Sequence, residues 1–164
     1  MICADILGER TRLSPERTAV VDVASGARLS YREMDHRAAT CARAWLYGLG
    51  LKRGDRLGIL SGNRLEFLDA FFAAAKCGVV LVPLGTRLTA TELAVIAEDS
   101  RLSGLVYGGE HAETVAELAR LTDVGRLVAL DDDDGGHAVS WDSVLASVGE
   151  GEWVPSVCEP EDPY

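Results

Sequence analysis

The sequence has few cationic residues and no long apolar run, and these two absences exclude several classes of protein. Sixteen Lys and Arg stand against 26 Asp and Glu in 164 residues, which gives a formal net charge of −10. A surface for nucleic acid or for an anionic membrane needs clustered cations, so we expect neither partner. No apolar segment approaches the roughly 18 residues of a membrane helix, so we expect no membrane span.

Cysteine pairs and targeting signals are also missing. The four cysteines form no CxxC pair and lie far apart, at Cys3, Cys41, Cys77 and Cys158. Cys41 and Cys77 fall in apolar helical patterns, which favour small buried thiols over a disulfide or a metal ligand. The first residues carry an acid at Asp5, too early for a secretory signal. These features predict a cytoplasmic location.

Catalytic motifs are missing as well. The sequence contains no GxxxxGK[ST] phosphate loop, no GxGxxG after a strand, no HExxH and no GxSxG. Its three histidines are far apart, and we expect each on the surface: His36, His111 and His137. The acidic run 131–134 cannot converge on a metal ion without a shaped loop, so it predicts a solvated turn. These residues by themselves predict a domain without a mechanism.

The apolar residues, 48% of the chain, are enough for one core and follow two alternating patterns. Short apolar or β-branched runs predict strands, at 18–23, 27–29, 56–60, 79–82, 105–107 and 126–130. Apolar residues at helical spacing predict helices, at about 30–49, 63–77, 89–100, 112–121 and 141–148. This alternation predicts an α/β fold, a layered structure with a largely parallel sheet and helices on both faces.

Capping signals place the starts of three of these helices. In each, a small polar residue precedes an acid by three positions, as in Ser30 with Glu33, Asn63 with Glu66 and Thr89 with Glu92. Residues 1–16 are interpreted as a polar lead-in. Residues 149–164 are rich in Gly, Glu and Pro and predict a loop or tail.

Several short motifs stand in a fixed order between residues 29 and 100. They are LSYREM at 29–34, GLKRGDRL at 50–57, NRLEFL at 63–68 and AKCGVVLVPL at 75–84, followed by Arg87-Leu88, Glu92 and Asp99-Ser100. In this order they resemble the beginning of the adenylate-forming, or AMP-binding, superfamily. Val79 and Gly85 depart from its usual Ala and Asn, and the stretch VPLGTRL is more similar to its acyl-CoA synthetase branch.

The resemblance implies that residues 1–164 form the N-terminal part of the large domain of a longer ligase. Such an enzyme uses ATP and Mg²⁺ to turn a carboxylic acid into an acyl-adenylate, and coenzyme A then forms the thioester. The family's phosphate loop and C-terminal domain come later in its order and are absent here. We therefore assign no catalytic residue, and we expect these residues alone to bind no cofactor and to be inactive.

One cofactor-binding candidate follows from the resemblance. Arg87 matches the arginine of the family's "x-R-L" motif, which implies a contact to a phosphate of coenzyme A through its guanidinium. The alternative is a solvated arginine near the start of a helix.

Two other functions stay open at this stage. One is a non-catalytic α/β binding or interaction module, and the other is part of an amino-acid-activating adenylation domain. The ligase hypothesis implies three partners: the rest of the large domain, the C-terminal domain and a small-molecule carboxylic acid. It also predicts an uncovered apolar face through which these residues self-associate.

Overall fold

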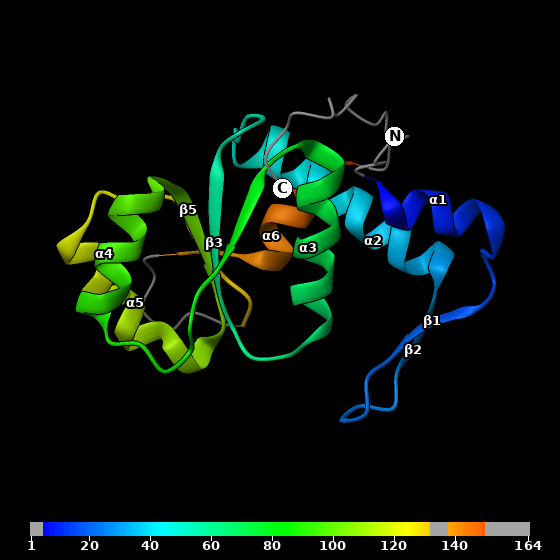
Figure 1. Cartoon of the computed structure of the whole chain (residues 1–164), viewed down its shortest axis with the longest axis horizontal. Coiled ribbons are helices and arrows are strands. Elements are labelled where there is room, and N and C mark those ends of the chain that lie inside the picture. The colour runs from blue at the N-terminus through cyan, green and yellow to red at the C-terminus, as the bar shows by residue number, and fades with distance from the viewer. Residues whose placement is uncertain (1–4, 132–137, 150–164) are drawn as a thin grey trace.

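A parallel sheet of five strands forms the centre of the computed structural model, which describes residues 5–131 and 138–149 (Figure 1). The strand order is β4-β3-β5-β6-β7. The strands are β3 (Arg56–Leu60), β4 (Val80–Pro83), β5 (Leu102–Tyr107), β6 (Leu127–Ala129) and β7 (Val139–Ser140). All four pairings between neighbouring strands are parallel.

Helices cover both faces of this sheet. On one face lie α4 (Ala90–Ser100) and α5 (Ala112–Leu121), which follows the short 3₁₀ helix η2 (Gly109–His111) (Figure 1). On the other face lie α3 (Leu65–Cys77) and α6 (Trp141–Ala146), and α2 (Tyr31–Arg43) packs against α3. A π-helical turn, η1 (Ala44–Gly48), continues α2. The predicted α/β fold with a parallel sheet and helices on both faces is confirmed.

The alternating direction of side chains along each strand divides the core into two layers. Leu57, Ile59 and Val106 pack with α2, α3 and α6. Leu60 and Leu105 point to the opposite face and pack with α4 and α5. Because the central strands β3 and β5 contribute to both layers, their residues form the near-continuous apolar runs seen in the sequence.

A smaller unit lies beside the sheet. It contains α1 (Ile6–Leu13) and an antiparallel hairpin of β1 (Thr18–Val21) and β2 (Arg28–Ser30). Leu7 is buried there against Met34 and Ala38 of α2. Figure 1 shows the hairpin beyond the end of α2, away from the sheet.

The interpretation of residues 1–16 as a polar lead-in missed the helix α1. Asp5 begins α1, because its side chain accepts a hydrogen bond from the Gly8 N–H at 2.9 Å. The Thr11 hydroxyl donates to the Tyr31 carbonyl, and the Arg10 guanidinium lies over the Tyr31 ring at 5.1 Å. Tertiary contacts therefore hold a helix that the local pattern does not show.

The remaining differences are small. β5 begins three residues earlier than predicted, and β7 has no predicted counterpart. Gly78 ends α3 in the left-handed region at φ 72°, a conformation that glycine adopts without strain. In the part of the chain that the structure describes, no helix is long and apolar enough to cross a membrane.

Candidate functional site

The strand order changes direction at β3, and this switch point marks where along the sheet a site is expected. From β3 the chain passes to β4 on one side and then crosses back to β5 on the other side of β3. In open parallel sheets, ligands bind beyond the carboxyl ends of the strands at such a switch point. The segments that follow β3, β5 and β6 are therefore the ones to examine.

Three residues from these segments form one hydrogen-bonded cluster, which we call the edge clasp: Arg64 after β3, Gly109 after β5 and Asp131 after β6. The Arg64 Nη1 and Nη2 donate to the two carboxylate oxygens of Asp131 at 2.8 and 3.0 Å. The Gly109 N–H donates to Asp131 Oδ2 at 2.9 Å. A fourth residue, Glu66, accepts from Arg64 Nε at 2.8 Å and orients the guanidinium.

These contacts shift the titration of the clasp in a consistent direction. The hydrogen bond from Arg64, followed by that from the Gly109 N–H, lowers the pKa of Asp131. The pKa of Arg64 is raised, first by its hydrogen bond to Asp131 and then by its hydrogen bond to Glu66. Arg64 and Asp131 are thus both charged at neutral pH. In the clasp, a guanidinium and a backbone N–H together hold one carboxylate.

The structure changes the interpretation of the acidic run. Asp131 was expected in a solvated turn, but it is held by two loops that are distant in sequence. Residues 132–137, including His137, lie outside the described residues. No group of three or more metal-ligating side chains occurs among the residues that are described.

Arg87, the one candidate taken from the family resemblance, lies in the turn between β4 and α4. The turn closes through a hydrogen bond from the Leu88 N–H to the Gly85 carbonyl at 3.1 Å. Arg87 is exposed there, at the same carboxyl edge of the sheet as the edge clasp. Its role as a coenzyme A contact stays a prediction.

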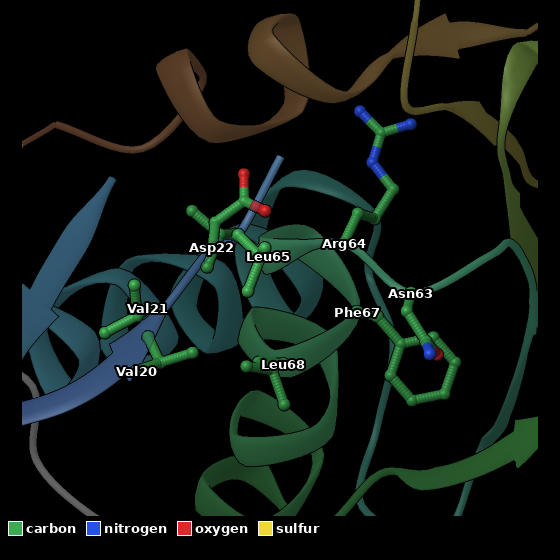
Figure 2. Close-up of a pocket in the computed structure, with 9 residues that line it drawn as sticks. Val20, Val21, Asp22, Asn63, Arg64, Leu65, Phe67 and Leu68 are labelled. Atoms are coloured by element: carbon green, nitrogen blue, oxygen red, sulfur yellow. The ribbon is translucent and has the colours of Figure 1, made fainter. Parts of the chain in front are cut away.

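A pocket of about 220 Å³ lies between the hairpin and the start of α3. Figure 2 shows Val20 and Val21 on one side and Leu65 and Leu68 on the other, with the Arg64 guanidinium pointing away from the strand. The pocket wall is therefore mainly apolar. It offers no group suited to acid–base chemistry beyond Asp22, whose carboxylate accepts from the Ser25 hydroxyl.

Two groups of ion-paired side chains, each with one buried member, lie between the helices, away from the carboxyl edge. Lys76 on α3 is 2% exposed and contacts Asp5 at 2.8 Å and Asp35 at 2.6 Å. Arg37 on α2 donates two hydrogen bonds to Asp69 on α3. Both groups join elements of the fold, so we assign them a structural role.

The cysteines and histidines fit the sequence expectations in most cases. Cys41 and Cys77 are buried thiols, as predicted, and burial raises the pKa of the Cys41 thiol well above its ordinary range. His36 is exposed as expected. His111 was also expected on the surface, but its side chain is only 14% exposed. Cys3 and Cys158 lie outside the described residues.

Sequence reasoning missed Arg64 and Asp131, although one signal for them was available. Each follows a predicted strand of the sheet, and the carboxyl ends of parallel strands meet at one edge. What the sequence lacks is the strand order, which places β3 and β6 on either side of β5.

The family model described as AMP-binding enzyme matches residues 7–164. Long-chain-fatty-acid–CoA ligase FadD13 of Mycobacterium tuberculosis is 36% identical over 118 residues, 72% of this chain and 23% of the ligase. Feruloyl-CoA synthase of Amycolatopsis sp is 41% identical over 139 residues, 82% of this chain and 28% of the synthase.

A solved structure gives the same result for the fold. The N-terminal domain of FACL13 from Mycobacterium tuberculosis matches 99% of this chain and 40% of its own, with a TM-score of 0.80 and 29% identity. The chain spans about a quarter of the length of the two curated relatives.

Proposed function

The chain belongs to the AMP-binding enzyme family, and we propose that it forms the N-terminal part of an ATP-dependent acyl-CoA synthetase. Residues 1–164 are then a section of the large adenylate-forming domain, and the phosphate loop and the C-terminal domain belong to the remainder of the ligase. That remainder is the partner we propose for this chain.

The similarity to feruloyl-CoA synthase carries the proposal, because it covers 82% of this chain at 41% identity. The proposed reaction has two steps. A carboxylate oxygen attacks the α-phosphorus of ATP, which gives an acyl-adenylate and releases pyrophosphate. The thiol of coenzyme A then loses its proton and attacks the acyl carbon, which gives the thioester and releases AMP. The first step replaces a poor leaving group by AMP, a good one.

The proposed cofactors are ATP, Mg²⁺ and coenzyme A, and the substrate is a small carboxylic acid. Mg²⁺ offsets phosphate charge during adenylation. Because ATP and coenzyme A are used in the cytoplasm, we also propose a cytoplasmic location.

Pyrophosphate exchange tests the proposal. The protein that carries this chain together with the proposed remainder is assayed for acid-dependent ATP–pyrophosphate exchange against a panel of acids, beside the 164-residue chain alone. We expect exchange from the longer protein and none from the chain alone. No exchange with any acid would favour a non-catalytic module. Exchange without thioester formation would point to an acceptor other than coenzyme A.

Arg87 is tested in the same assay. Its exposed position at the carboxyl edge supports a contact to a phosphate of coenzyme A, by bidentate hydrogen bonding. We expect Arg87→Ala to raise the KM for coenzyme A while the exchange reaction, which needs no coenzyme A, is unchanged. Arg120→Ala, on the exposed side of α5, is the control for loss of one positive charge. An unchanged KM would reject the contact.

A further inference from the structure

We propose that Arg64 and the Gly109 N–H form a binding site for an oxyanion, and that Asp131 occupies this site when no ligand is present. The ligand is a carboxylate or a phosphate, since both present two oxygens to a guanidinium. The inference is independent of the proposed activity, because it follows from the donors at the switch point of the sheet.

The donor set is the first observation. Arg64 Nη1 and Nη2 and the Gly109 N converge on one carboxylate, at 2.8, 3.0 and 2.9 Å. A bidentate guanidinium with an added backbone N–H is a common way to bind a carboxylate or phosphate. Asp131 therefore shows where the oxygens of an external anion would lie.

The support of Arg64 is the second observation. Glu66 accepts from Nε at 2.8 Å, so the guanidinium keeps its orientation without Asp131. The Arg64 and Glu66 side chains are 28% and 26% exposed, so this supporting contact is itself partly buried. Loss of Asp131 from the clasp leaves these donors in place.

Exposure is the third observation, and it makes exchange feasible. The Asp131 side chain is 45% exposed, so an anion from solvent reaches the clasp without unfolding of the core. An exposed ion pair contributes little stability even with good geometry, and its replacement by a similar pair costs correspondingly little. A carboxylate ligand would give Arg64 and the Gly109 N–H an acceptor group of the same kind as the one that they lose.

Position is the fourth observation. The clasp joins the loops after β3, β5 and β6, at the switch point where open parallel sheets bind ligands. The ion pairs of Lys76 and Arg37 lie between helices instead, and their acids Asp5 and Asp69 have side chains that are only 22% and 5% exposed. The second acid of Lys76, Asp35, is 28% exposed, so among these bridges the clasp has the most exposed anionic side chain.

The test uses the 164-residue chain labelled with ¹⁵N, with sodium phosphate and sodium acetate as separate probes and sodium chloride at matched ionic strength. The Gly109 amide signal is followed during each titration. We expect a saturable shift in the wild type, and a dissociation constant about tenfold lower in Asp131→Ala, if the clasp is open about a tenth of the time. The comparison of phosphate with acetate identifies which oxyanion is preferred.

Arg64→Met removes the guanidinium and should abolish the saturable shift, whereas Arg120→Met, the exposed control on α5, should leave it unchanged. If Asp131→Ala does not fold, Asp131→Asn provides the same comparison with the shape of the side chain kept. Absence of a saturable shift in the Asp131 variants would reject the site. Saturable anion binding by the Asp131 variants but not by the wild type would show that an external anion does not displace Asp131.

Discussion

At the scale of single residues, Asp131 is ordered by a partner that is distant in the sequence. Its neighbours are three further acids, and local composition predicts a solvated turn. The partner that orders it, Arg64, is 67 positions away. No local spacing encodes such a pair, because it depends on the order of strands in the sheet. The buried thiols, by contrast, were predictable from the helical pattern around Cys41 and Cys77.

The lowered pKa of Asp131 predicts a stability that depends on pH. The folded state favours the charged form of Asp131, whose pKa lies below the ordinary value of 3.8. Its contribution is therefore present at neutral pH and lost as the pH falls below 3.8 toward the folded-state pKa. The free energy of unfolding of the wild type should exceed that of Asp131→Asn by no more than about 1 kcal/mol at neutral pH, since the ion pair is exposed. Urea unfolding at neutral and acidic pH measures the gap.

The gap between wild type and Asp131→Asn should narrow at acidic pH. Asp123→Asn, at an exposed position after α5, is the matched control and should show no comparable gap at either pH. A gap for Asp131→Asn that stays constant from neutral to acidic pH would show that the carboxylate charge contributes nothing to the clasp.

Substitution of Lys76 should lower the free energy of unfolding more, because its side chain is buried. Its ammonium is 2% exposed and lies between Asp5 and Asp35. Lys76→Met leaves two partly buried carboxylates without this cation, which should cost about 3 kcal/mol in the free energy of unfolding. Urea unfolding measures it, with Lys52→Met, at an exposed position, as the control. A loss no greater than that of Lys52→Met would mean that solvent replaces the ammonium.

At the scale of elements, capping signals predicted helix starts well where the chain entered the helix directly. Ser30 and Thr89 both cap their helices, and the backbone N–H of each donates the reciprocal hydrogen bond to the carboxylate of its acid partner. Asn63 does not cap α3: the helix begins at Leu65, Arg64 occupies the cap position in extended backbone, and it makes no side-chain cap bond. Glu66 bonds to Arg64 instead. The edge clasp therefore competes with the capping box for the same acid.

This difference in capping predicts unequal losses of stability for two similar substitutions. Ser30→Ala removes the acceptor for the Glu33 N–H and should lower the free energy of unfolding by about 1 kcal/mol. Asn63→Ala should change it by no more than a few tenths of a kcal/mol, because surface substitutions without such a role have small effects. Thermal or urea unfolding of both variants checks the prediction. Equal losses would contradict the assignment of the α3 cap.

At the scale of the whole molecule, the layered fold was predictable because period and burial agree. Strands buried on both faces give short apolar runs, and the helices between them carry apolar stripes. The side unit was less predictable. Its helix α1 has one buried residue, Leu7, and depends on contacts to α2. The two strands of the hairpin were predicted, but the position of the hairpin relative to α3 follows only from packing.

The hairpin leads to a prediction about association. β1 pairs only with β2 among the described residues, so its other edge is unpaired. Val21 and Val23 are 41% and 92% exposed beside the apolar pocket that lies against α3. Unpaired edges and exposed apolar patches promote association of proteins. The chain alone should therefore bind a hydrophobic dye or self-associate at micromolar concentration.

Dye fluorescence and sedimentation velocity measure both properties, and a pair of variants locates the surface. The double substitution Val21→Glu with Val23→Glu should reduce association, because it places two charges on the edge that would pair. Val95→Glu adds one charge at a 64% exposed position on α4, on the face of the sheet away from α3, and should have little effect. Equal reduction by both would mean that net charge, not the hairpin, controls association. A clean monomer without dye binding would instead favour a self-sufficient module and weigh against a surface that the rest of a ligase covers.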